Sequence, residues 1–203
     1  MKKFFTLIVA TLMASSMMAQ MHGAMTFAGP SSINVLTQNT GNACDTVRFE
    51  MASTSAGNIT LPVMQGMAAI PSFTIENVAF SMGENHVISI AEQTFTSKVT
   101  VNGEEKNIEG SSISGSYNMA DNSLTLKAVF KYGSMPFDLT YEVKAYYVKP
   151  VASAITVNVG GTFIYGNDGV TYNVRKYIDG DVEKVDVEIP TYTLDNTVMG
   201  NLT

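Results

Sequence analysis

Apolar and polar residues alternate along most of the chain after residue 45, and this pattern constrains the fold more than any other feature. Between residues 124 and 131, even positions carry Leu, Leu, Ala and Phe, whereas odd positions carry Thr, Lys, Val and Lys. The same period of two runs through residues 139–147 and 184–189. It is typical of strands with one buried and one solvated face. No segment beyond the first twenty residues has the spacing of an amphipathic helix, so we predict an all-β protein.

Short turn signals separate the alternating segments. Asn102-Gly103 lies between two of them and predicts a two-residue hairpin, because both residues tolerate a positive φ. Short links between successive strands indicate an antiparallel meander. We expect eight strands, near residues 45–51, 59–64, 72–80, 86–91, 94–101, 107–115, 122–131 and 136–148.

Eight antiparallel strands that share one apolar face can close into a small barrel without free edges. We therefore predict an eight-stranded, antiparallel, up-and-down barrel over residues 45–150, ended by Pro150. A two-sheet sandwich stays open as the alternative, because the same alternation permits it.

A nine-residue phrase occurs twice, as IPSFTIENV at residues 70–78 and as IPTYTLDNT at residues 189–197. Eight of the nine pairs are identical or chemically close. A repeat of this kind indicates two copies of one β unit. Residues 151–203 are therefore predicted to be a partial second copy, which adds further strands after the barrel.

This second copy is too short to be stable alone. Its roughly fifty residues cannot bury enough apolar surface to offset about 1.5 kcal/mol of ordering entropy per residue. Three explanations stay open: a truncated chain, strands added to the first unit, or completion by another subunit, which would make a homo-oligomer. We favour truncation, because residues 201–203 stop in mid-pattern without a turn or a charged cap.

The first residues have the composition of a targeting segment. Lys2 and Lys3 precede an apolar run over residues 4–14, and small residues such as Ala19 follow it, so residues 1–19 are predicted to be a signal peptide. The apolar run is shorter than the ~20 residues that span a bilayer. We expect a protein exported to the periplasm, the outer surface or the medium, with no membrane span in the mature chain. Residues 20–44 are interpreted as a leader segment before the barrel.

The charge balance argues against two classes of partner. The chain has 12 Lys and Arg against 18 Asp and Glu, and loss of Lys2 and Lys3 with the signal peptide lowers the net charge from −6 to −8. Nucleic acids and anionic lipids both favour basic clusters, so we expect neither as a partner. The single cysteine, Cys44, excludes an intrachain disulfide, and we interpret it as a half-buried residue beside a turn rather than a link to another chain.

Two longer segments resemble a known family. They are IPSFTIENVAFSM at residues 70–82 and GSYNMADNSLTLKAVFKYGSMPFDLTYEVKA at residues 115–145. Together with the signal peptide, they resemble the calycin-like β-barrel proteins exported by Gram-negative anaerobes. The resemblance covers residues 45–149, with 153–203 as a partial second copy. It implies a lipocalin-shaped barrel, a shape that often holds small hydrophobic molecules, but it carries over no functional residues.

Residues that would carry catalysis or bind a metal do not gather in the sequence. His22 and His86 are the two histidines, and no HxH, HExxH or CxxC pair occurs. A G-x-S-x-G nucleophile motif is also missing. We therefore expect no catalytic residues, no metal and no cofactor, and a protein that is not an enzyme.

Three acidic residues in the second copy could in principle bind calcium. They are Asp179, Asp181 and Glu183. We favour a tight hairpin at Asp179 instead, because Glu183 leads into a strand whose Val185 and Val187 mark the buried side.

We expect a binding protein that holds a small hydrophobic or amphipathic ligand inside the barrel. Aromatic residues with polar tips are suited to such a cup. A packed barrel would use the same side chains to fill its interior. The alternative is therefore a structural or surface-interaction module with a filled barrel, which recruits partners through exposed strands of the second repeat. The expected ligand-lining residues are Phe73, Ile75, Phe130, Tyr141 and Tyr147.

Overall fold

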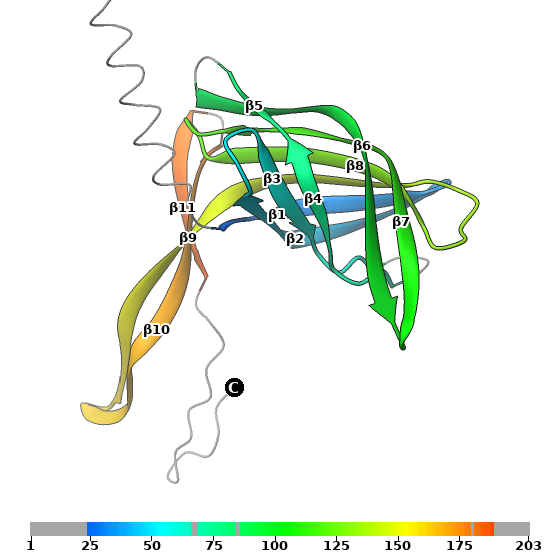
Figure 1. Cartoon of the computed structure of the whole chain (residues 1–203). Helices are drawn as coiled ribbons and strands as arrows, with labels where there is room; N and C mark the ends of the chain where they lie inside the picture. Colours follow the sequence, from blue (N-terminus) through cyan, green and yellow to red (C-terminus); the bar gives the residue numbers. More distant parts are fainter. Residues whose placement is uncertain (1–23, 66–68, 84–85, 180, 189–203) are drawn as a thin grey trace, which may run out of the picture. The chain divides into compact units, whose positions relative to one another are not determined.

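A computed structural model describes residues 24–65, 69–83, 86–179 and 181–188 (Figure 1). These residues form an all-β structure, an antiparallel sheet of 11 strands, as the alternation predicted. The chain divides into two compact units, residues 1–147 and 148–203. The predicted signal peptide lies outside the described residues. The strands are β1 (Met25–Val35), β2 (Gln38–Met51), β3 (Ala56–Leu61), β4 (Phe73–Ala79), β5 (Ser81–Met82), β6 (Val87–Val101), β7 (Glu104–Asn118), β8 (Ser123–Tyr132), β9 (Leu139–Val159), β10 (Thr162–Asp179) and β11 (Val182–Glu188).

The first unit is a meander in which most strands pair with their neighbours in sequence. Its hydrogen-bonded order is β4-β3-β2-β1-β9-β8-β7-β6-β5, so β1 lies beside β9. The predicted hairpin at Asn102-Gly103 joins β6 to β7, and both residues have positive φ, 53° and 81°. Because the order begins at β4 and ends at β5, main-chain hydrogen bonds among the described residues do not close the predicted barrel.

Strand β1 corrects the interpretation of residues 20–44 as a leader. It pairs with β2 from Met25 opposite Phe49 to Val35 opposite Gln38, and it buries Phe27 to 1% exposure. The alternation is interrupted by the turn-like segment Gly-Pro-Ser-Ser at residues 29–32, where the register with β2 shifts. Inward positions beyond this segment are apolar again.

Two predicted strands, 86–91 and 94–101, are one strand. β6 runs through both, and its register with β7 shifts on either side of Gln93. The polar residues between the two segments therefore mark a bulge instead of a turn. With β1 added and these two merged, eight strands besides the two-residue β5 contribute to the first unit, namely β1–β4, β6–β8 and the first part of β9.

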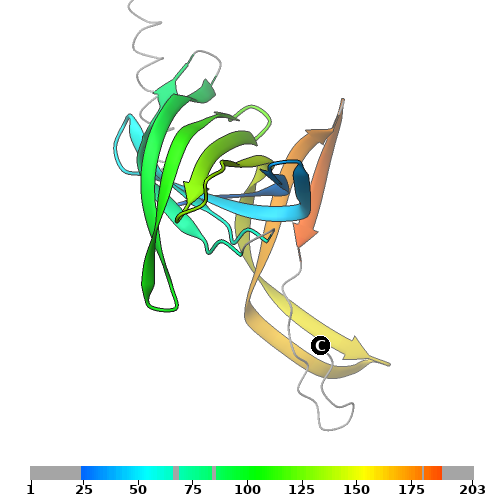
Figure 2. The ribbon, with the colours of Figure 1, turned by 90° about the vertical axis from the view of Figure 1, so that its right-hand side faces the viewer.

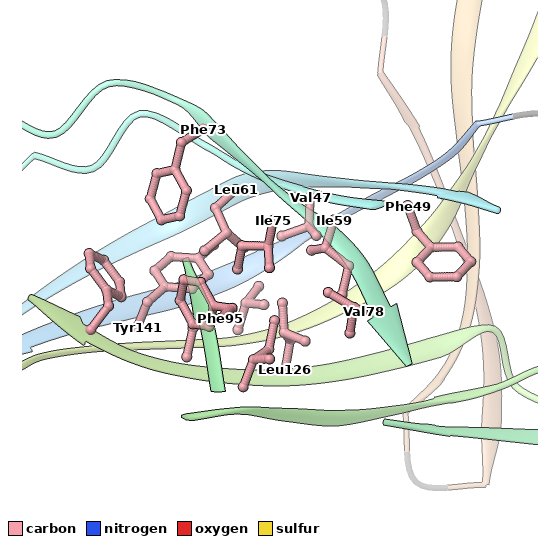
Figure 3. Packing of buried hydrophobic residues seen from close by; sticks show 14 of the residues in the cluster. Val47, Phe49, Ile59, Leu61, Phe73, Ile75, Val78, Phe95, Leu126 and Tyr141 are labelled. Atoms are coloured by element: carbon pink, nitrogen blue, oxygen red, sulfur yellow. The ribbon is translucent and has the colours of Figure 1, made fainter. Parts of the chain in front are cut away.

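The apolar faces of these strands meet in one core (Figure 3). In β8 and β9 the inward residues predicted by alternation are buried, from Leu124 to Phe130 and from Leu139 to Ala145, all at 5% exposure or less. Burial of one such large side chain contributes about 1.5–3 kcal/mol. The core therefore holds the sheet in its curved form.

In the second unit, the last part of β9 pairs with β10, and β10 pairs with β11. Gly160 and Gly161 take positive φ, 61° and 82°, at the turn between β9 and β10. Arg175 forms an ion pair with Asp186 across β10 and β11. The repeat phrase at residues 189–197 lies outside the described residues.

The apolar face of β11 differs from its prediction. Val185 and Val187, expected to mark a buried side, are 50% and 54% exposed, and Val182 is 58% exposed. Among the strands that the structure describes, β11 pairs only with β10. The part of the second unit that the structure describes offers no second layer to cover these side chains.

Candidate functional site

The five residues expected to line a ligand cup belong to the packed core. Phe73, Ile75, Phe130 and Tyr141 are 4%, 0%, 0% and 1% exposed, and Tyr147 is partly buried against the core. The rings of Phe73 and Phe130 meet edge to face with centroids 5.4 Å apart. These side chains fill the interior by packing on other side chains. This is the filled interior that the sequence left open as the alternative to a ligand cup.

The structure does not bring these residues together around one cavity. Tyr141 lines a cavity of about 110 Å³, whereas Phe73 lines a separate groove of about 850 Å³. Ligand sites usually measure about 300–1,000 Å³. The cavity at Tyr141 is too small for a hydrophobic ligand, and the groove at Phe73 is large enough.

The groove follows a line between β4 and β6, here called the seam. The two strands lie side by side without main-chain hydrogen bonds between them. Side chains bridge the seam instead. The Gln93 side chain accepts a hydrogen bond from the Ala79 N–H at 2.9 Å and donates one to the Ala79 carbonyl at 2.8 Å. Ser97 Oγ donates to the Thr74 carbonyl at 2.7 Å. These bonds satisfy backbone groups that a strand partner would otherwise bond.

Beyond the Ser97–Thr74 bond a hollow opens, here called the seam groove. Its lining comes from β3, β4, β6 and β7, and Figure 2 shows the β6–β7 hairpin, in green, extending as an arm of the first unit. The groove is lined by Thr60, Pro71, Ser72, Phe73, Thr74, Glu76, Thr96, Ser97, Lys98, Val99, Thr100, Asn107, Ile108 and Glu109.

The lining of the seam groove is amphipathic. Phe73, Val99 and Ile108 line it from nearly buried positions, at 4%, 7% and 0% exposure, so the floor of the groove is apolar but only slightly accessible. Serine and threonine side chains and one asparagine also line it; Ser72 and Ser97 already donate to main-chain carbonyls and Thr60 bonds Thr74, so these hydroxyl oxygens can serve a ligand mainly as acceptors. Lys98 is held by Glu105 at 2.6 Å, so its charge is already paired. Such a surface suits a ligand with one apolar face and several uncharged polar groups.

A second polar cluster lies at Asp45, which is 8% exposed. Its carboxylate accepts hydrogen bonds from Ser31 Oγ, from Asn42 Nδ2 at 2.5 Å and from Tyr141 Oη at 3.3 Å. Burial and then the negative charge of Asp45 raise the pKa of Tyr141 above its ordinary value. The phenol therefore stays protonated and can donate to the carboxylate throughout the neutral pH range.

Sequence reasoning missed both sites, and each had a detectable signal. Asp45 occupies an inward position ahead of Val47 and Phe49, so a charged residue interrupts an apolar face. Cys44, next to it, is exposed, which corrects the expectation of a half-buried thiol because this position of β2 points outward. For the seam the signal is Gln93, a polar residue between the segments 86–91 and 94–101, which were predicted as two strands.

The described residues were also compared with the requirements of a metal site and of a membrane-spanning helix. Within the described ranges, no three His, Cys, Asp or Glu side chains converge as metal ligands would. The same residues include no helix that is long and apolar enough to cross a bilayer.

Comparison with known proteins shows no family for the chain. No family model and no curated protein matches it. Among solved structures, it is similar to the crystal structure of a "putative outer membrane protein" from Bacteroides fragilis NCTC 9343, with a TM-score of 0.48 and 20% identity. The match covers 62% of this chain and 50% of that one, so it spans about half the length of that protein. This likeness carries no argument about function, and the resemblance to the calycin-like family stays a prediction.

Proposed function

We propose that the chain is a non-enzymatic binding protein, of the calycin-like kind that the sequence resembles, and that it holds a small amphipathic ligand in the seam groove. The observation that carries this proposal is the combination of a packed interior with an open groove of about 850 Å³ at the seam. The ligand would lie in the seam groove at Phe73, and not among the packed side chains of the core.

The chemistry of the lining supports an uncharged, hydroxyl-bearing ligand. Apolar atoms of the ligand would lie against the nearly buried Phe73, Val99 and Ile108, and the gain of about 25 cal/mol per Å² would come mainly from the ligand's own apolar surface as it leaves water. Its polar groups would bond the hydroxyls of the walls. The two carboxylates of Glu76 and Glu109 would oppose an anionic ligand.

An NMR titration with n-octyl β-glucoside, kept below its critical micelle concentration, tests the proposal. This probe has a sugar head and an alkyl chain, as the lining requires. We expect saturable shifts of the backbone amides of Thr74, Ser97 and Thr100. Thr100→Trp, which fills the groove from an exposed position, should abolish them, whereas Thr46→Trp, at an exposed position of β2 away from the groove, should not.

Two results would contradict the proposal. Shifts centred on Leu126, Phe130 and Tyr141 would place the ligand inside the barrel. Shifts that never saturate, or that persist unchanged in Thr100→Trp, would remove the seam groove as the site.

The exposed face of β11 favours a second function, an interaction module that pairs with a second copy of the chain. Antiparallel pairing of two β11 strands centred on Val185 would place each Lys184 opposite Asp186 of the other copy. Opposite charges at facing strand positions are favourable, and the half-exposed valines would gain cover.

Sedimentation velocity over a range of concentrations tests this second function. We expect a reversible dimer that Val185→Lys converts to a monomer. Leu36→Lys, at a 68% exposed residue of the first unit, should leave the dimer intact. A monomer at every concentration would exclude self-association through β11.

A further inference from the structure

A small cavity opens beside the buried carboxylate of Asp45, and it shares no lining residue with the seam groove. Its volume is about 110 Å³. Buried side chains of Ile33, Asp45, Met64 and Tyr141 contribute to it, and exposed residues contribute as well. The full lining is Ser31, Ile33, Thr40, Gly41, Asn42, Asp45, Val63, Met64, Gln65 and Tyr141.

The exposed lining residues give the cavity a mouth toward solvent. Thr40, Val63 and Gln65 are exposed, whereas Asp45 and Tyr141 are 8% and 1% exposed. A small molecule entering past the exposed residues would therefore meet the carboxylate at the buried end.

The charge of Asp45 is solvated by neutral groups. Its hydrogen-bond donors are the hydroxyls of Ser31 and Tyr141 and the amide of Asn42. Among the residues that the structure describes, no lysine, arginine or histidine forms an ion pair with it. Hydrogen bonds to a carboxylate are strong, but a buried charge without an opposite charge remains costly. A cation in the adjacent cavity would lower that cost.

We propose that this cavity binds a primary ammonium group. Such a group carries one positive charge and three N–H donors, and the cavity offers the Asp45 carboxylate with the hydroxyl oxygens of Ser31, Thr40 and Tyr141 as acceptors. Ile33 and Met64 provide an apolar wall for the methylene groups next to the nitrogen. A divalent metal fits this lining less well, because Asp45 is its one carboxylate and the other oxygens are neutral.

The ammonium group could come from a free alkylamine or from a lysine side chain of a partner. Both present the same head and stem to the cavity. Thermal unfolding of the full chain at constant ionic strength distinguishes the sources, with n-butylammonium chloride as the first probe and Nα-acetyl-lysine methylamide as the second. n-Butanol and sodium butyrate serve as matched probes that lack the positive charge.

We expect the Tm to rise and saturate with one or both ammonium probes, and with neither butanol nor butyrate. A response to butylammonium alone assigns a free amine, and a response to the lysine derivative assigns a lysine side chain. No saturable rise with either ammonium probe, or an equal rise with butanol, would overturn the proposal.

Two variants locate the site. Asp45→Asn keeps the shape of the side chain and removes its charge, so it should abolish the response. Val63→Trp, at a half-exposed residue of the mouth, should block entry and also abolish it, and it serves where Asp45→Asn does not fold. Thr46→Trp, an exposed control on β2, should respond as the wild type does. A response retained in Val63→Trp would overturn the proposal.

Discussion

The two units of the chain share one strand pattern but bury it to very different extents. In the first unit, Val47, Ile75 and Leu126 are 1%, 0% and 3% exposed. In the second, Val185 and Val187 occupy the apolar positions of a similar alternation and are 50% and 54% exposed. Both sets are aliphatic side chains, and both recur with a period of two.

The difference separates what alternation determines from what it does not. A period of two decides which side chains share a face of a strand. Burial of that face also needs a second layer opposite it. The first unit provides one by bringing β4 next to β6, so that its strands enclose a common core. The described part of the second unit has three paired strands and no opposing layer.

The largest expected effect comes from emptying the core of the first unit. Phe130→Ala removes a fully buried ring that meets Phe73 and Phe95, and we expect the free energy of unfolding to fall by about 3–5 kcal/mol. Val185→Ala, in the second unit, should change it by less than about 0.5 kcal/mol. Urea unfolding of both variants measures the contrast. Equal losses of unfolding free energy in the two variants would contradict the difference in burial between the two units.

A smaller effect tests whether β1 belongs to the first unit. A Cβ at Gly29 would overlap the Lys144 carbonyl oxygen and lie 2.7 Å from the Ala145 Cα, so Gly29→Ala should cost about 1–3 kcal/mol. At Gly41 the nearest atom, the Ser31 carbonyl oxygen, is 3.8 Å away. Gly41→Ala should therefore leave stability unchanged or raise it slightly. Two neutral substitutions by the same urea assay would mean that β1 does not pack on β9.

Alkaline pH should weaken the first unit through its buried tyrosines. Burial raises the pKa of Tyr117 to about 12, and it raises that of Tyr141 as well. Above about pH 10 the unfolded chain loses these phenolic protons while the folded chain keeps them. The free energy of unfolding should therefore be unaffected below pH 10 and fall above it, by up to about 1.4 kcal/mol per pH unit for each group.

Tyr141→Phe should remove part of this alkaline slope, at the cost of one hydrogen bond to Asp45. Unfolding curves between pH 8.5 and about 11.5 in wild type and variant measure it. The same slope in both proteins would mean that Tyr141 titrates as an exposed phenol does.

The smallest expected effect concerns the seam. Gln93→Ala removes two hydrogen bonds to Ala79 in a solvent-accessible setting, and we expect a loss of about 1 kcal/mol. Amide hydrogen exchange at Ala79 should accelerate, because its N–H loses its partner. Thr94→Ala, the exposed neighbour, is the control. Unchanged exchange at Ala79 would show that the side chain does not close the seam.

The sequence predicted the all-β class, the antiparallel meander and the inward residues of β8 and β9. These depend on local alternation and turn residues, which a single sequence displays. It missed β1, because the polar run after Phe27 resembles a loop until β9 is known to lie beside it. It placed Phe73 and Tyr141 in one cup, but their distance depends on how the sheet curves.

The two candidate sites were also beyond local reasoning. The seam groove exists because β4 and β6 meet without pairing, which depends on how the strands are arranged in space and not on the sequence of either strand alone. Asp45 becomes a candidate site residue because it accepts a hydrogen bond from Tyr141, which is 96 positions away in the chain. Gln93 and Asp45 both interrupt the apolar–polar alternation, and each lies at one of the two candidate sites.

The contrast between the two units can be read directly from methyl NMR with a neutral gadolinium chelate in solution. We expect the methyl signals of Val47, Ile75 and Leu126 to stay sharp while those of Val182, Val185 and Val187 broaden strongly. Equal broadening of both sets, or protection of the β11 valines in a monomer, would contradict this expectation.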